Sequence, residues 1–153
     1  MKVFNAAMAV FGFLVSSSKL EEKGLDVFVR LVTEYEIISK LLDKSEEGNT
    51  RISNKAQEGI IDFSFHPMIG EGFSSTYLMS RLDTHLSNNN IKGTQIMLSL
   101  LFKFITSFGI TKKDSPLDPK KTLKLVIRPL FHKDQEVRNM ALKVLLEIQK
   151  KTG

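Results

Sequence analysis

The sequence predicts an all-α protein in which antiparallel helix pairs stack into a right-handed α-solenoid. Apolar residues recur three and four positions apart along most of the chain, which is the spacing of amphipathic helices. No stretch alternates apolar and polar residues for long enough to predict a half-buried strand. Short polar corners also recur at intervals of roughly 40 residues, which is the period of stacked helix pairs.

The size and composition are those of one soluble folded domain. We expect residues 1–153 to form a single domain, and we expect that domain to be a piece of a longer protein. The chain has no cysteine, which excludes disulfides and thiolate metal sites. Lys and Arg total 22 against 17 Asp and Glu, so the net charge is +5. This charge favours an acidic partner, which could be nucleic acid, a membrane surface or an acidic protein.

The N-terminal segment up to Ser18 admits two interpretations. Lys2, the apolar run from Ala6 to Val15 and three consecutive serines resemble a short secretory signal. The run is shorter than the roughly 20 apolar residues that cross a bilayer. It equally fits a helix that is buried between neighbours, and this is the interpretation we favour.

From residue 25 onward the pattern predicts helices separated by polar corners. The expected helices are 25–44, 51–65, 74–86 and 91–108, followed by a final pair that begins at Asp118. Gly70 and Gly72 are expected in a loop. Gly109 should end the helix 91–108. Asp118 should cap the next helix, with Pro119 at its first position.

The final pair has the clearest pattern. Pro129 should bend its first helix, and Asp134 should cap its second. The expected buried stripe of the first helix is Leu123, Val126, Ile127, Leu130 and Phe131. The expected stripe of the second is Val137, Met140, Ala141, Val144, Leu145 and Ile148.

Three corners share one arrangement, in which a short polar residue stands three positions before a β-branched residue. The pairs are Asn49 with Ile52, Asn88 with Ile91, and Asp134 with Val137. The β-branched residues are 39 and 46 positions apart, close to the roughly 40–47 of helix-pair repeats. We expect them to fill the space behind each corner, where Ala56 and Ala141 would let the helices approach closely.

The residue pattern does not predict an enzyme. The three histidines, His66, His85 and His132, lie in separate segments without the spacing of metal ligands, so we expect no metal site. No nucleophile elbow or glycine-rich phosphate loop is found, and we expect no catalytic residue and no cofactor.

Positive charge gathers at the corners instead. The cations there are Lys44, Arg51, Lys92, Lys133 and Arg138. Stacked helix pairs would align these corners along one basic edge. Nucleic acid is not the favoured partner, because no aromatic residues stand among these cations to stack on bases. Arg138 is expected to bond either the carbonyls at the end of the preceding helix or an acidic group of a neighbouring repeat, rather than a ligand.

The corner Glu136-Val137-Arg138 with its following helix resembles a HEAT repeat. Together with the corner from Leu41-Leu42 to Arg51-Ile52 and the helix 91–108, it makes the chain resemble the later part of a TOG domain, most closely in the ciliary-tip centrosomal protein family. The chain has about three and a half helix pairs, fewer than a complete TOG domain. The resemblance implies binding of tubulin through the loops within each pair. The contact candidates it implies are Asn49, Thr50, Arg51, Asn89, Asn90, Lys92, Lys133 and Arg138, whereas Pro129, Asp134 and Val137 are structural.

The same resemblance implies a cytoplasmic protein at microtubule ends, centrioles or ciliary tips. The chain has no tryptophan, although TOG domains commonly present one from their first loop, so we expect weak and salt-sensitive binding. Two other functions remain open. One is a generic helical-repeat scaffold that binds a protein through its concave face or a terminal apolar patch. The other is a secreted helical protein whose signal ends near Ser18.

Overall fold

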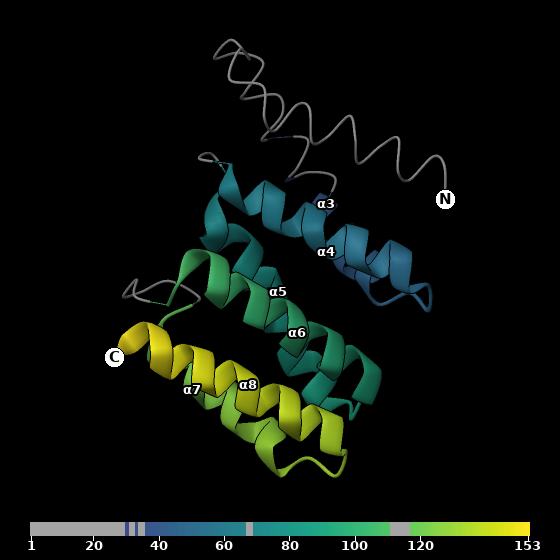
Figure 1. Ribbon diagram of the computed structural model, residues 1–153. Coiled ribbons are helices and arrows are strands. Elements are labelled where there is room, and N and C mark those ends of the chain that lie inside the picture. Colours follow the sequence, from purple (N-terminus) through teal and green to yellow (C-terminus); the bar gives the residue numbers. More distant parts are fainter. Residues whose placement is uncertain (1–29, 31–32, 34–35, 67–68, 111–116) are drawn as a thin grey trace. The chain divides into compact units, whose positions relative to one another are not determined.

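In the part of the chain that the structure describes, every element of secondary structure is a helix (Figure 1). The structure is a computed structural model that describes residues 30, 33, 36–66, 69–110 and 117–153. Its helices are α3 (Ile37–Ser45), α4 (Thr50–Phe65), α5 (Gly70–Ser87), α6 (Ile91–Phe108), α7 (Pro119–Ile127), the 3₁₀ helix η1 (Arg128–Phe131) and α8 (Gln135–Thr152). The all-α prediction is confirmed for these residues. The expected N-terminal helix and the link at residues 111–116 lie outside them.

The chain divides into two compact units, one ending at Gly70 and the other beginning at Glu71. In the first unit α3 packs against α4. The hydroxyl of Ser53 donates to the carbonyl of Ser45, which ties the start of α4 to the end of α3. The buried apolar core of this unit comprises Ile38, Leu41, Leu42, Ala56, Ile60 and Phe63.

The prediction of one continuous helix over 25–44 is wrong. Arg30 and Thr33 are helical, but Glu36 has φ 50 and ψ 40, and α3 begins only at Ile37. A left-handed residue cannot continue a right-handed helix. The apolar spacing runs through this break unchanged, which is why the sequence does not reveal it.

In the second unit α8 packs against α6, α7 and η1. This packing of neighbouring helices is compatible with an α-solenoid. The large side chains that α6 buries completely are Met97, Leu98, Leu100, Leu101, Phe104 and Ile105. Gly109 ends α6 with φ 77, as predicted, and Asp118 accepts hydrogen bonds from the backbone of Lys120 and Lys121 at the start of α7.

The expected loop at Gly70 and Gly72 is instead the first turn of α5. Gly70 has φ 70, a conformation that glycine adopts without steric cost, and α5 begins there. Glu71 lies in the first turn, where its charge complements the helix dipole. Glycine therefore starts this helix rather than breaking it.

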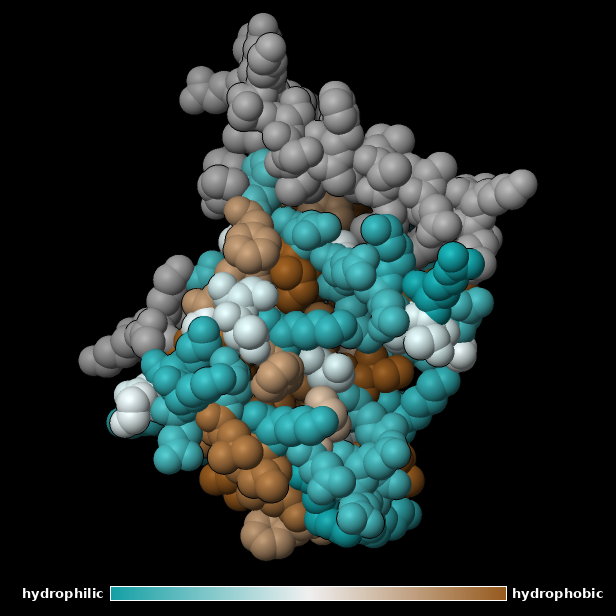
Figure 2. All heavy atoms as spheres, viewed as in Figure 1, coloured by the Kyte–Doolittle hydropathy of each residue, from teal (hydrophilic) through white to brown (hydrophobic). Residues whose placement is uncertain are grey.

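At Pro129, where the sequence predicts a bend, the helix changes type. The α-helix α7 ends at Ile127, and η1 continues from Arg128 to Phe131 with Pro129 buried. The predicted buried stripe is nevertheless wrong at two positions. Ile127 is 46% exposed and Phe131 is 85% exposed, whereas Val126 is fully buried. Hydrophobic side chains accordingly reach the surface over α7, η1 and α8 (Figure 2).

Candidate functional site

Each corner between paired helices is closed by one capping side chain. The side-chain oxygen of Asn49 accepts from the backbone N–H of Arg51 at 3.0 Å and of Ile52 at 3.3 Å. Asn90 accepts from Gly93 and Asp134 from Val137, each at 3.0 Å. All three caps thus satisfy the N–H of the third helical residue, which would otherwise lack a partner.

The structure corrects the second corner. The predicted capping residue was Asn88, but Asn90 caps α6, while Asn89 takes a left-handed conformation with φ 57. The caps are therefore 41 residues apart from Asn49 to Asn90 and 44 apart from Asn90 to Asp134. These intervals are more even than those of the predicted alignment.

Burial follows the same alignment. Seven positions after each cap stands a fully buried residue, and fourteen positions after it stands a large buried one. The first set is Ala56, Met97 and Ala141, and the second is Phe63, Phe104 and Ile148.

The predicted role of Ile91 behind the second corner is wrong, because Gly93 occupies the position of Ile52 and Val137. A Cβ at Gly93 would lie 2.7 Å from the imidazole of His85, so that ring fills the space.

The second and third corners touch one another within the second unit. The Nε2 of His132 lies 3.2 Å from the Oδ1 of Asn89. The Nδ1 of His132 accepts from the backbone of Asp134, so Nε2 carries the proton and donates to Asn89. The amide of Gln95 donates to the carboxylates of Asp134 and Glu136, both at 3.2 Å. These bonds place two corners side by side on one edge.

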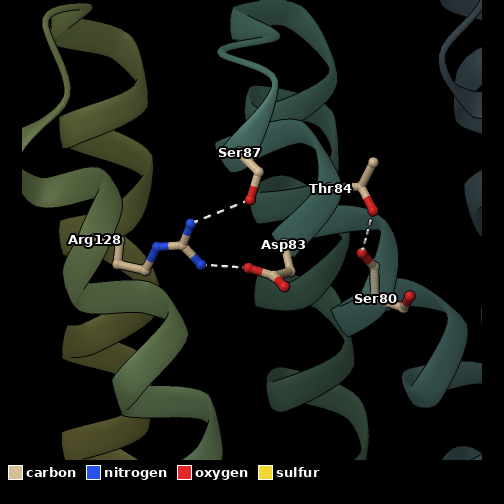
Figure 3. A network of polar contacts seen from close by, with 5 residues as sticks. All are labelled: Ser80, Asp83, Thr84, Ser87 and Arg128. Atoms are coloured by element: carbon tan, nitrogen blue, oxygen red, sulfur yellow. Dashed lines mark hydrogen bonds and ion pairs between the residues drawn. The ribbon is translucent and has the colours of Figure 1, made fainter.

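A further polar contact joins the two helix pairs away from the corners (Figure 3). Arg128 of η1 forms an ion pair with Asp83 of α5, and it also donates to the hydroxyl of Ser87 at 3.5 Å. The sequence offers no signal for this contact, because its partners are more than 40 positions apart.

Several predicted contact residues are occupied in closing the corners. Asn49 and Asn90 are caps, and Asn89 bonds His132. Arg138 donates from Nη1 to the carbonyls of His132 at 2.7 Å and Lys133 at 2.8 Å. Its guanidinium therefore holds the third corner, which is the structural role expected of it.

Three predicted cations remain exposed at the corners. Arg51 and Lys92 each stand two positions after a cap, and Lys133 stands one position before one. Within the part of the chain that the structure describes, their side chains make no hydrogen bond or ion pair. Lys44, by contrast, pairs with Glu47. The exposed Thr50 lies beside Arg51 in the first corner.

Acidic residues on the same edge were missed by the sequence reasoning. Glu136 stands at the position of Arg51 and Lys92, so the third corner carries a negative charge there. The hydrogen bond from the backbone of Val137 is the largest influence on the pKa of Asp134 and lowers it. Desolvation opposes this effect, and a hydrogen bond from Gln95 lowers the pKa further. Aligning the caps, rather than counting cations, would have revealed this sign change.

The described residues contain no cluster of three or more His, Asp or Glu side chains placed to hold a metal ion. Of the helices that the structure describes, none is both long and apolar enough to cross a membrane. The groups that the corners expose are the cations Arg51, Lys92 and Lys133 and the hydroxyl of Thr50, which can form ion pairs and hydrogen bonds.

Comparison with protein-family models finds no match, and comparison with curated proteins finds no relative of significant similarity.

Proposed function

We propose that the chain is a non-catalytic HEAT-type α-solenoid of the TOG kind that binds tubulin through its corners, which are the loops within each helix pair. The recurrence of three capped corners, 41 and 44 residues apart, supports the repeat type. The exposed cations Arg51, Lys92 and Lys133 carry the binding proposal. Tubulin is strongly acidic, and the net charge of +5 favours association with such a partner.

Only these three cations are proposed as the charged contacts. Each exposed charge pair contributes about 0–1 kcal/mol, so three pairs support weak binding that falls with ionic strength. Thr50 lies beside Arg51 and adds a hydroxyl. The proposed place of action is the cytoplasmic microtubule end, centriole or ciliary tip.

The test is the triple variant R51E/K92E/K133E, whose cosedimentation with tubulin is measured at low and high salt. Loss of three pairs of about 0.5 kcal/mol each predicts roughly tenfold weaker binding at low salt. The matched control K55E/K121E/K151E makes the same change of charge at exposed lysines away from the corners. Equal weakening by both variants would reject the corner edge, and no binding by the parent chain would reject tubulin as the partner.

A general protein-binding scaffold is the second candidate function. The observation that favours it is the exposed apolar surface of the last helix pair, which a corner-binding function does not use.

A further inference from the structure

The last helix pair exposes four large apolar side chains on its outward side. Ile127 is 46% exposed, Phe131 85%, Leu142 51% and Leu146 56%. We call these four residues the α7–α8 face. Hydrophobic side chains gather over these elements along the lower edge of the view in Figure 2.

The stacking inside the second unit shows what such a face contacts. Asp83 and Ser87 of α5 receive Arg128 from the next pair (Figure 3). Counted back from the caps Asn90 and Asp134, the positions of Asp83 and Ser87 are those of Ile127 and Phe131 in the last pair. Ile127 and Phe131 are therefore exposed at the positions through which the preceding pair contacts its neighbour.

The second helices of the two pairs can be compared in the same way, by counting positions from their caps. Leu98 stands eight positions after its cap and is completely buried in α6, which packs against α8. Its counterpart in α8 is Leu142, and the counterpart of the half-buried Phe102 is Leu146. The α7–α8 face therefore continues the helix-on-helix interface within the unit, with apolar residues where α5 has Asp and Ser.

The residues around the face define the charge of its partner. Lys120 and Lys124 stand seven and three positions before Ile127, on the same side of α7. Lys143 and Lys150 stand three positions before and four after Leu146, on the same side of α8. Glu147 forms an ion pair with Lys150 at 3.7 Å and offsets its charge. The rim remains basic through the other three lysines, whose side chains make no ion pair with the residues that the structure describes.

We propose that the α7–α8 face binds an amphipathic helix of a partner protein, whose apolar stripe is flanked by acidic side chains. The apolar stripe would cover Ile127, Phe131, Leu142 and Leu146, and the acidic residues would meet the lysine rim. A second copy of this chain fits less well, because it would bring the same lysines against each other. An anionic membrane would match the charge but would not continue the helix-on-helix interface. This surface is separate from the corner edge proposed to bind tubulin.

The test uses the full chain and two synthetic helical peptides that share one leucine stripe. One peptide carries Glu on both flanks of the stripe, and the other carries Lys. Fluorescence anisotropy should show binding of the Glu peptide with a Kd on the order of micromolar, and at least about tenfold weaker binding of the Lys peptide. The variant L142Q/L146Q should weaken binding of the Glu peptide at least about tenfold.

The matched control is T76Q/S80Q, which changes two exposed residues four positions apart on α5 and should leave binding unchanged. Thermal unfolding should give L142Q/L146Q the midpoint of the parent chain. If that variant does not fold, F131Q at the most exposed of the four positions provides the same comparison.

Four results would overturn the proposal. The first is equal binding of the two peptides, and the second is unchanged binding of the Glu peptide by L142Q/L146Q and F131Q. The third is a dimer in light scattering that L142Q/L146Q abolishes, which would assign the face to a second copy. The fourth is binding to phosphatidylserine vesicles without binding to either peptide, which would assign it to a membrane.

Discussion

Two arginines of the corners, Arg51 and Arg138, have different roles despite their identical chemistry. Arg138 donates to the carbonyls of His132 and Lys133 and so stabilises its own corner. Arg51 stands two positions after a cap, and its guanidinium donates to no carbonyl of the residues that the structure describes. The difference follows from position relative to the cap, because a side chain four positions after the cap can reach back over the turn.

Gly93 is a residue at which a methyl group should be costly. Its Cβ would lie 2.7 Å from the buried ring of His85 and 2.8 Å from the amide of Asn90. We expect G93A to lower the free energy of unfolding by about 1–3 kcal/mol, although alanine favours helices by about 1 kcal/mol. Urea denaturation measures this change.

G72A is the matched control, because a Cβ there would meet nothing within 4 Å. It should raise the free energy of unfolding by up to about 1 kcal/mol. In the double variant H85A/G93A the cost of the methyl group should largely disappear. A G93A protein as stable as the parent would show that the His85 ring moves aside freely.

Asp134 should make the third corner sensitive to acid. Its pKa is lowered from 3.8 in the folded protein, chiefly by the hydrogen bond from the backbone of Val137. Because the pKa of this carboxyl is lower in the folded protein than in the unfolded chain, its charge stabilises the folded state at pH values above the unfolded pKa. This stabilisation is lost as the pH falls through the folded pKa. Between about pH 5 and about pH 2, the parent should therefore lose more stability than D134N, which keeps the cap without the charge. Equal losses in urea denaturation would contradict this account.

At the scale of helices, three capped starts were predictable, whereas the break at Glu36 and the 3₁₀ geometry at Pro129 were not. Asp118, Asp134 and Asn49 are short polar residues directly before apolar periodicity, so local chemistry marks those helix starts. The break at Glu36 has no glycine or proline to announce it. Pro129 does announce a change, but the 3₁₀ geometry that it introduces turns Phe131 outward, which the spacing of a continuous α-helix does not predict.

The break before α3 yields a prediction for E36G. Glycine adopts the left-handed conformation of Glu36 without the roughly 1–2 kcal/mol cost borne by other residues, although it gives up part of this gain in the unfolded chain. E36G should therefore raise the free energy of unfolding by about 0.5–1 kcal/mol. The control K40G, at an exposed position inside α3, should lower it by about 1 kcal/mol. Destabilisation by both variants in urea would place Glu36 inside a regular helix.

At the scale of the molecule, the second unit presents two surfaces of different chemistry. Lys92 and Lys133 lie within two positions of the caps Asn90 and Asp134. Leu142 and Leu146 lie eight and twelve positions after Asp134, which corresponds to about 12 and 18 Å along the helix. The polar corner edge and the apolar α7–α8 face can therefore bind different partners.

This separation predicts that the two proposed activities are independent. R51E/K92E/K133E should weaken binding to tubulin and leave the Kd for the Glu-flanked peptide within about twofold. L142Q/L146Q should do the reverse. Measuring both partners with both variants distinguishes failure of one proposal from failure of the other. Parallel loss of both activities would indicate a single surface or a folding defect.

The sequence by itself determined the helical class, most helix boundaries and the three corners, because apolar spacing and capping residues act over one or two helical turns. It also placed Arg51, Lys92 and Lys133 at corners. Only the tertiary structure decided that Asn90 rather than Asn88 caps α6, that Arg138 is occupied by corner carbonyls and that Ile127 and Phe131 are exposed. These outcomes depend on the His85 ring, on contacts between residues more than 40 positions apart and on which helix covers which face. The spacing of residues within one helix contains none of this information.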